Sequence, residues 1–245
     1  MCSKLKNYKI EISYDGSLFH GFQKQLNLKT VQSVIEKSTD LILQNYDLNY
    51  AGRTDAGVHA KSQILSLRTS DTLNKDFLKS LDSLVGDEIK IKKIQQVKKS
   101  FHPRFDAKSR VYKYFIQGAD TWEPYNRNYS YIAKTQLEIN ELRSVEKIFL
   151  GKKNFTNYSK LRKGQDPFRE ITKSKWSKKD GHFVYTIEGN SFLHNMVRSI
   201  VGCQLAVIQN KITKKEIQNS LIDPQKRRFN YIAPAHGLYL WKVKY

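Results

Sequence analysis

The chain has 245 residues and carries 43 Lys and Arg against 23 Asp and Glu, a formal net charge of +20 that indicates a polyanionic partner such as nucleic acid. Its 39% of hydrophobic residues, with 14 Tyr and 12 Phe, exclude a disordered protein. Its only two cysteines, Cys2 and Cys203, form no CxxC pair, which argues against a disulfide framework or a zinc site.

The first 106 residues predict the element order β-α-β-β-α-β. Alternating apolar residues indicate strands, and apolar residues three or four positions apart indicate helices. The predicted elements are strand 8–14, helix 31–43 with Thr30 as N-cap, strand 48–51, strand 63–68, helix 75–84 closed by Gly86, and strand 89–97. A glycine-punctuated loop at 52–59 separates the second strand from the third.

Residues 107–245 predict a second half with the same order. Its elements are strand 110–117, helix 136–150 ending at Gly151, strands 169–177 and 183–188 joined by the hairpin turn Lys179-Asp180-Gly181, helices 191–208 and 214–221, and strand 238–243. We therefore predict an α+β fold of two ferredoxin-like halves with joined antiparallel sheets. Helices would cover one face of the sheets, and the open face would form an RNA cleft.

We expect a soluble, cytoplasmic protein with no membrane partner. The longest apolar stretch, 196–208, is too short to span a bilayer and is interrupted by Arg198 and Gln204. The first residues lack the apolar core of a secretory signal.

The most informative segment is the loop Ala51-Gly52-Arg53-Thr54-Asp55-Ala56-Gly57-Val58-His59-Ala60. Its glycines permit a sharp turn and a close approach to another segment. One interpretation is structural, with Asp55 accepting hydrogen bonds from nearby amides in an Asx turn. A carboxylate among bound phosphates would weaken RNA affinity, so its presence in this basic chain favours a role in chemistry. These residues alone do not identify the reaction.

The same loop closely resembles the signature loop of the tRNA pseudouridine synthase A family, and the resemblance extends in order across most of the chain. The other matching segments are Tyr14-Asp15-Gly16-Ser17-Leu18-Phe19-His20-Gly21-Phe22-Gln23-Lys24-Gln25, Thr30-Val31-Gln32, Phe101-His102-Pro103-Arg104-Phe105-Asp106-Ala107, Arg110-Val111-Tyr112-Lys113-Tyr114, Asn154-Phe155-Thr156-Asn157-Tyr158, Phe192-Leu193-His194-Asn195-Met196-Val197-Arg198-Ser199-Ile200-Val201-Gly202 and Gly237-Leu238-Tyr239-Leu240. Phe22 stands where the family usually has Trp.

The resemblance implies a cofactor-free isomerase that converts tRNA uridines, in or near the anticodon stem-loop at tRNA positions 38–40, to pseudouridine. It also implies a homodimer. The uridine would leave the helical stack, and Asp55 would act as an ionised nucleophile or base.

Two residues of the second half match catalytic and pocket positions of the family. Arg198 follows apolar helix positions, so it either snorkels to solvent or pairs with an acid, and the resemblance implies that it pairs with Asp55 and keeps it ionised. Tyr112 and Tyr114 share one strand face, which leaves either as a core residue. The resemblance selects Tyr112 as the ring that stacks on uracil.

Three further residues have two interpretations each. Arg53 is a phosphate ligand by default, and the resemblance adds that it fills the gap left by the flipped base. Leu238 is a core leucine by default, and the resemblance makes it the apolar wall of the uridine pocket. His59 is a general base or a structural hydrogen-bonding residue, and it is one of the candidate substrate-binding residues.

Two rival functions remain open on the residues alone. Asp82, Glu88 and Lys90 resemble the acid pair and lysine of a metal-dependent nuclease, although so short a pattern arises easily in a Lys-rich chain. A non-catalytic protein of two RNA-binding modules would explain the charge and the aromatic residues but not the acidic loop.

Overall fold

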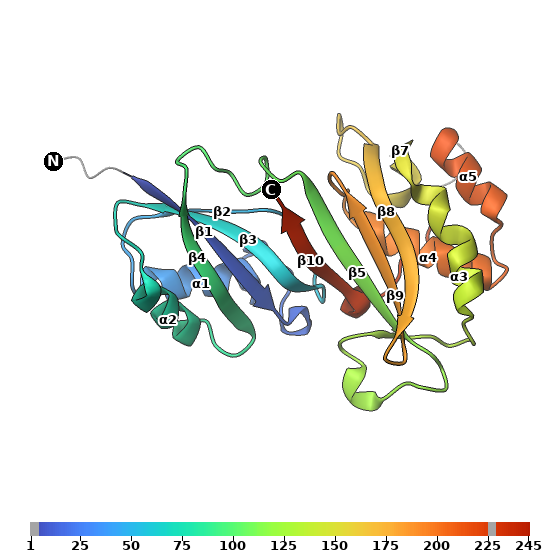
Figure 1. The fold of residues 1–245 in the computed structure, drawn as a ribbon, viewed down its shortest axis with the longest axis horizontal. Helices are drawn as coiled ribbons and strands as arrows, with labels where there is room; N and C mark the ends of the chain where they lie inside the picture. The colour runs from blue at the N-terminus through green and yellow to red at the C-terminus, as the bar shows by residue number, and fades with distance from the viewer. Residues whose placement is uncertain (1–4, 225–228) are drawn as a thin grey trace. The chain divides into compact units, whose positions relative to one another are not determined.

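The computed structural model describes residues 5–224 and 229–245, so Cys2 lies outside the described residues. The chain forms two compact units (Figure 1), Met1–Lys108 with Leu240–Tyr245, and Ser109–Tyr239. Residues 240–245, which the sequence prediction placed in the second half, belong to the first unit. The α+β class is confirmed, with each unit built from an antiparallel sheet and helices.

The first unit is a ferredoxin-like β-α-β-β-α-β fold. Its elements are β1 (Lys6–Tyr14), η1 (Gly16–Leu18), α1 (Val31–Asp40), β2 (Asp47–Tyr50), β3 (His59–Thr69), α2 (Lys75–Leu84) and β4 (Ile89–Val97). β1 lies between β3 and β4, and β2 pairs with β3, all antiparallel. The resulting order β4-β1-β3-β2 requires each helix to cross over a neighbouring strand, which brings both helices to one face of the sheet.

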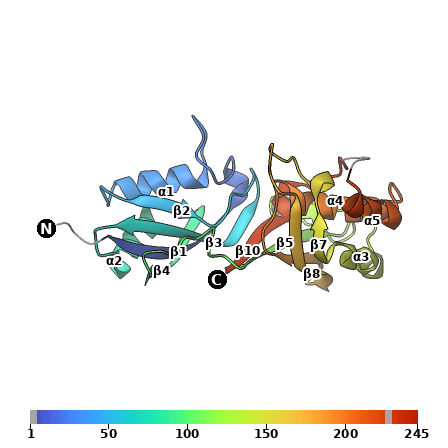
Figure 2. The ribbon, with the colours of Figure 1, turned by 90° about the horizontal axis from the view of Figure 1, so that it is seen from above.

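Local signals explain why the helices of the first unit begin where they do. Thr30 caps α1 in a reciprocal capping box with Ser33, and Asn74 accepts two backbone N–H groups at the start of α2. The hydroxyl of Ser38 donates to the carbonyl of Leu84 at 3.1 Å, so the C-terminal ends of α1 and α2 lie together. Figure 2 shows α1 along the sheet of this unit.

The first unit buries one side of its strands in a regular alternation. On β1 the side chains of Tyr8, Ile10, Ile12 and Tyr14 are each 5% exposed or less, and the alternate residues Lys9, Glu11 and Ser13 are partly exposed. This period of two is the pattern expected of a strand with one face on the core.

The second unit has four antiparallel strands in the order β5-β9-β8-β7, with short β6 parallel to β5. Its elements are β5 (Ser109–Gln117), η2 (Pro124–Asn126), β6 (Tyr131–Ile132), α3 (Ile139–Glu146), η3 (Lys147–Phe149), β7 (Gly151–Asn154), η4 (Thr156–Tyr158), β8 (Phe168–Lys179), β9 (His182–Gly189), α4 (Met196–Ile208), α5 (Lys214–Ile222) and η5 (Ala235–Gly237). The last strand, β10 (Leu238–Lys244), begins in this unit and ends in the first.

Helices α3 and α4 pack near Trp176 of β8, whose side chain is fully buried. The indole Nε1 of Trp176 donates to the side-chain oxygen of Gln204 on α4 at 2.7 Å. The backbone N–H of Trp176 donates to the carboxylate of Glu146 on α3 at 2.5 Å. Tyr114, Tyr185 and Trp176 lie opposite one another on β5, β9 and β8 and form the centre of this core.

Three of the differences between the sequence prediction and the structure lie in the second unit. Helix 191–208 begins only at Met196, because Asn195 adopts a left-handed backbone with φ of 61° that a continuing helix cannot contain. The predicted helix 136–150 is α3 followed by a short 3-10 turn. Strand β7 was missed, because its sequence Gly-Lys-Lys-Asn has no apolar alternation. The turn at Asp180 and Gly181 is confirmed, with φ values of 48° and 75°.

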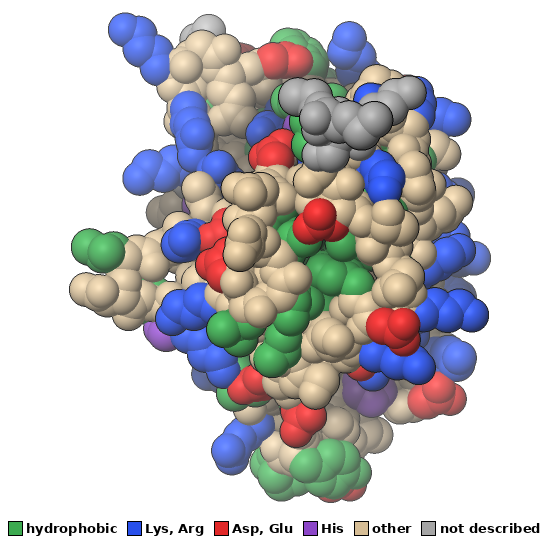
Figure 3. All heavy atoms as spheres, turned by 90° about the vertical axis from the view of Figure 1, so that its left-hand side faces the viewer, with side chains coloured by type: hydrophobic (Ala, Val, Ile, Leu, Met, Phe, Trp, Pro, Cys, Tyr) green, Lys and Arg blue, Asp and Glu red, His purple; other side chains and the backbone are tan. Residues whose placement is uncertain are grey.

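Positive charge is spread over the surface rather than confined to a tail. The space-filling view of Figure 3 shows Lys and Arg side chains around the visible face, with acidic side chains among them and a hydrophobic patch near the centre. Lys173 and Lys175 of β8 are exposed. None of the described helices is both long and apolar enough to cross a membrane.

Candidate active site

The loop between β2 and β3 is closed by a backbone turn at Asp55. The N–H of Val58 donates to the carbonyl of Asp55 at 3.1 Å, and Gly57 has a φ of 78°. A positive φ at the third residue is what a type II turn requires, and glycine adopts it without strain. The turn is therefore closed by main-chain groups of Asp55 and Val58.

A second segment, residues 14–22, holds this loop from the side. The N–H of Phe22 donates to the carbonyl of Thr54 at 3.1 Å, and the hydroxyl of Tyr14 lies 2.8 Å from that of Thr54. A Cβ added to Gly16 would lie 2.0 Å from the carbonyl oxygen of Val58, so only glycine permits this approach. The loop is thus held against a segment that lies about forty positions earlier in the chain.

The two charged side chains at the centre of the loop differ in exposure. Asp55 is half-buried and Arg53 is exposed. The Nε of Arg53 donates to the hydroxyl of Tyr50 at 3.2 Å, and the ring of Tyr50 packs on Phe22 with centroids 4.7 Å apart. Arg53 is therefore held at its Nε while its side chain remains exposed to solvent, which suits a contact with RNA phosphate.

His59 is buried, with 2% of its side chain exposed. Its Nδ1 accepts the N–H of Gly16 at 3.0 Å and lies 3.2 Å from a carboxylate oxygen of Asp15. An Nδ1 that accepts from Gly16 carries no proton, so this hydrogen bond and a charged pairing of His59 with Asp15 exclude each other. These contacts connect the segment containing Gly16 to the start of β3.

In the second unit, Arg198 lies in the first turn of α4 and is partly exposed. Its Nε donates to the carbonyl of Ala233 at 2.8 Å, and the N–H of Ala233 donates back to the carbonyl of Arg198 at 3.0 Å. Its Nη1 donates to the side-chain oxygen of Asn195 at 3.2 Å. Two separate acceptors therefore fix the plane of the guanidinium.

A glycine on α4 permits the close packing that brings Ala233 within reach of Arg198. A Cβ added to Gly202 of α4 would lie 2.4 Å from the carbonyl oxygen of Tyr231. The chain segment 231–234 therefore lies directly on α4. The hydroxyl of Tyr114 donates to the carbonyl of Pro234 at 2.9 Å, which ties the same segment to β5.

The two tyrosines that sequence could not separate occupy different environments. Tyr114 is fully buried, and burial raises the pKa of its hydroxyl well above the ordinary value. Tyr112 is only half-buried, and its ring meets Phe192 edge-on with centroids 5.1 Å apart. The interpretation of Tyr114 as a core residue is confirmed, and Tyr112 retains exposed ring surface.

Leu238 begins β10 and is 5% exposed. The preceding Gly237 packs so closely on Tyr114 that an added Cβ would lie 2.7 Å from its ring. Leu238 is therefore buried, as expected of a core leucine, and its part in a uridine pocket remains a proposal.

The three residues of the nuclease hypothesis do not form one cluster. Lys90 pairs with Asp82 at 2.5 Å, and Asp82 also accepts the N–H of Ile91 at 2.8 Å. Glu88 pairs with Lys29 at 2.6 Å, and this hydrogen bond lowers the pKa of Glu88. Within residues 5–224 and 229–245, no group of three or more His, Cys, Asp or Glu is arranged to hold a metal ion. These acids are thus engaged in separate local ion pairs.

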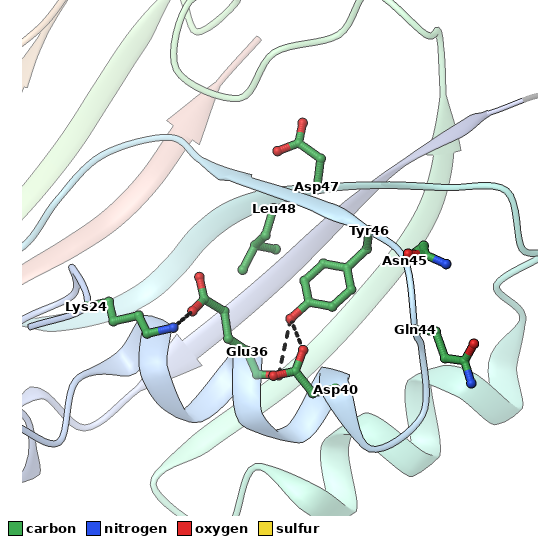
Figure 4. A pocket seen from close by; sticks show the side chains of 8 residues that line it. All are labelled: Lys24, Glu36, Asp40, Gln44, Asn45, Tyr46, Asp47 and Leu48. Carbon is green, nitrogen blue, oxygen red and sulfur yellow. Dashed lines mark hydrogen bonds and ion pairs between the residues drawn. The ribbon is translucent and has the colours of Figure 1, made fainter.

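A surface depression of about 490 Å³ lies between α1 and β2, and none of the predicted site residues lines it. Figure 4 shows Lys24 directed at Glu36 and Tyr46 directed at Asp40, while Gln44, Asn45 and Asp47 point away from them. Lys24 pairs with Glu36 at 2.7 Å, and the hydroxyl of Tyr46 donates to Asp40 at 2.6 Å. Burial first, and then the bond to Asp40, raises the pKa of Tyr46. A lining rich in carboxylates is unsuited to RNA phosphates.

Several residues that support the site were not predicted from sequence as supporting residues. They are Gly16, Asn195, Gly202 and Ala233. Asn195 and Gly202 lie inside the matched segment that contains Arg198, so the motif held a signal for them. Nothing in the local pattern around Ala233 indicates its contact with α4.

Comparison with known proteins gives a consistent result. A family model described as tRNA pseudouridine synthase matches residues 146–245. The tRNA pseudouridine synthase A of Borreliella afzelii (strain PKo) is 37% identical over 98% of this chain and 100% of its own length. The tRNA pseudouridine synthase A 1 of Bacillus cereus is 33% identical over 97% of this chain and 98% of its own.

Among solved structures, the crystal structure of a Cbf5-Nop10-Gar1 complex aligns with a TM-score of 0.42 and 9% identity, over 94% of this chain and 50% of that chain. A likeness this low supports no inference about the site.

Proposed function

This chain belongs to the tRNA pseudouridine synthase A family, and from that premise we propose that Asp55 is the catalytic carboxylate of its tRNA uridine isomerase reaction. The observation that carries the proposal is the loop itself. Its turn is closed by backbone groups, while the half-buried Asp55 lies beside the exposed Arg53.

The reaction requires a group that acts on the nucleoside while ionised. The bond between N1 and C1′ of uridine breaks, the base turns, and a bond forms between C5 and C1′. The proton on C5 is lost to solvent and N1 gains one, so the product is an isomer of the substrate. A carboxylate serves as nucleophile or as base only in its ionised form. The uridine must also leave the helical stack to be reached.

Arg198 is proposed to pair with Asp55 and keep it ionised. A guanidinium whose Nε and Nη1 are already fixed presents its remaining N–H groups in a defined direction. Such preorganised charge stabilises a reacting anion without reorganisation during the reaction.

Three side chains are proposed to bind the substrate, and one to support the loop. Tyr112 stacks on the uracil with its exposed ring surface, and Leu238 forms the apolar wall beside it. Arg53 contacts phosphate and occupies the gap left by the flipped base. His59, being buried, is proposed to act by holding the loop through Gly16 rather than by touching uridine.

The targets are proposed to be uridines in or near the anticodon stem-loop, at tRNA positions 38–40, and the working form a cytoplasmic homodimer. Both follow from the resemblance of the matched segments to the family. Sedimentation of the protein at micromolar concentration, with and without tRNA, measures the oligomeric state. Mapping of pseudouridine in substrate tRNA identifies the positions.

Replacement of Asp55 tests the function most simply in vitro. We expect Asp55→Asn and Asp55→Ala to reduce tritium release from tRNA containing 5-tritiated uridine by roughly 10⁴-fold or more, because the group that performs the chemistry is gone. Binding of tRNA should persist.

The matched control is Asp82→Asn, which makes the same substitution at an aspartate that pairs with Lys90. This variant should retain tritium release, and activity in EDTA should be unchanged. Substantial turnover by Asp55→Asn would refute the catalytic assignment.

A further inference from the structure

Phe105 is one of the most exposed large apolar side chains among the described residues, with 74% of its surface open to solvent. It lies in segment 101–106, which leaves the first unit's sheet after β4. A phenylalanine this exposed leaves apolar area in water that a bound partner would bury.

The backbone around Phe105 is held in place by its own short-range contacts. The N–H of Asp106 donates to the carbonyl of His102 at 3.1 Å, and the N–H of His102 donates to the carboxylate of Asp106 at 3.2 Å. The N–H of Arg104 donates to Nδ1 of His102 at 3.2 Å. These bonds form a closed turn with Phe105 at its tip.

The base of this turn is anchored to the core of the first unit. Phe101 is 7% exposed, and its ring packs on Tyr245 with centroids 5.0 Å apart. The side chain of Asn7 donates to the carbonyl of Phe101 at 2.9 Å, and the hydroxyl of Tyr245 donates to the carbonyl of Pro103 at 2.8 Å. The exposure of Phe105 is therefore built into the fold.

The surroundings of the Phe105 ring suit a nucleobase. The ring of His102 lies against it, with centroids 4.4 Å apart and planes inclined by 39°. The guanidinium of Arg104 lies 5.6 Å from the ring centroid. An aromatic face beside a cation binds a base by stacking and the attached phosphate by charge. The formal net charge of +20 favours a polyanion such as tRNA as the occupant.

We propose that Phe105 and Arg104 form a base-stacking contact for tRNA, separate from the contact that Tyr112 makes with the reacting uridine. The stacked base is an unpaired or terminal base of the tRNA, because a base inside a helix has both faces covered. The proposal rests on tRNA as the substrate and is independent of the catalytic role of Asp55.

Equilibrium binding of unmodified tRNA to the full-length chain tests the contact. We expect Phe105→Ala and Phe105→Leu to weaken binding by roughly 5- to 150-fold, the range for loss of one base–aromatic stack, and Phe105→Trp to retain it. KM should rise with kcat nearly unchanged, because chemistry on bound substrate does not use this ring. Leu41→Ala, at an equally exposed position of 73%, is the matched control and should bind normally.

Salt dependence separates the two members of the contact. Arg104→Gln should reduce the slope of log Kd against log salt by roughly 0.7 to 0.9, the value for one phosphate contact. Phe105→Ala should leave that slope unchanged because it removes no charge.

Two outcomes would overturn the proposal. Full affinity in Phe105→Leu would mean that the contact is apolar but not stacking. Unchanged tRNA binding together with a change in oligomeric state on sedimentation would mean that the turn contacts another copy of the chain. Because Asp55→Asn is measured by turnover and Phe105→Ala by affinity, failure of either leaves the other standing.

Discussion

The loop that carries Asp55 and the helix that carries Arg198 present opposite charges by different means. The loop is shaped by main-chain contacts, the turn to Val58 and the bond from Phe22 to Thr54. Arg198 lies on a regular helix, and its own side chain is fixed by hydrogen bonds to Ala233 and Asn195.

Both regions contain a closely packed glycine, but the first must hold its backbone in place and the second must hold a side chain. In each, a glycine permits an approach that a Cβ would block, Gly16 beside Val58 and Gly202 beside Tyr231. A carboxylate on a short side chain is positioned once its backbone is held. A long arginine side chain loses much more rotamer freedom, so its guanidinium must be held directly. Changes to backbone contacts should therefore disturb the loop that carries Asp55. Changes to the hydrogen-bond acceptors of Arg198 should disturb the second region.

Among changes to the contacts that hold the two regions in place, the largest expected effect concerns the guanidinium of Arg198. A lysine at position 198 has one ammonium group and cannot meet Ala233 and Asn195 in the same planar arrangement. We expect Arg198→Lys to lower kcat by roughly 100- to 1,000-fold with tRNA affinity little changed, as for loss of one preorganised electrostatic group. Single-turnover tritium release measures it.

The control for this variant is Arg143→Lys, an exposed arginine on α3. It should be indistinguishable from the unaltered protein. Full activity in Arg198→Lys would show that any cation at that position is sufficient, and the comparison of the two regions would lose its basis.

A smaller effect is expected at Tyr112. Tyr112→Ala should lower kcat/KM by roughly 5- to 150-fold through loss of base stacking, with little change in thermal stability. Tyr114→Ala should instead cost about 3–5 kcal/mol of folding free energy, because the ring is fully buried and its hydroxyl is bonded to Pro234. For both variants, steady-state kinetics measure kcat/KM and chemical denaturation measures the free energy of unfolding. Equal destabilisation by the two would contradict the separation of core from site.

The smallest expected effect concerns the glycines of the first region. Gly16→Ala should cost about 1–3 kcal/mol and reduce activity as well, because the new Cβ displaces Val58 and with it the loop. Gly52→Ala, where a Cβ meets nothing within 4 Å, should be neutral within about 0.5 kcal/mol. Denaturant titration of both variants measures the change in the free energy of unfolding. Destabilisation by Gly52→Ala but not by Gly16→Ala would contradict the claim that Gly16 is the glycine on which the loop depends.

Elements with complete local signals could be predicted to the residue. Helix 75–84 and strand 89–97 match the structure because Asn74, the helical spacing and Gly86 all act within a few positions. The start of α4 could not be predicted in the same way. Phe192 and Leu193 continue the apolar spacing, and only the left-handed backbone of Asn195 ends it.

The site follows the same division. The motif around Asp55 and the position of Tyr112 on its strand could be recognised in the sequence. Gly57 adopts the positive φ of a turn, as the glycine-containing loop predicted. Gly52, expected to have a similar role, lies in open space. The contacts of Gly16 with Val58 and of Ala233 with Arg198 join positions far apart in the chain, and no local pattern encodes such an approach.

The central claim is that Asp55 performs the chemistry of this enzyme, and mapping of pseudouridine in cellular tRNA tests it most directly. Cells lacking the gene would be complemented with the unaltered protein, with Asp55→Asn or with Asp82→Asn. The account predicts that pseudouridine lost on deletion returns with the unaltered protein and with Asp82→Asn but not with Asp55→Asn. Restoration of pseudouridine by stably expressed Asp55→Asn would contradict it.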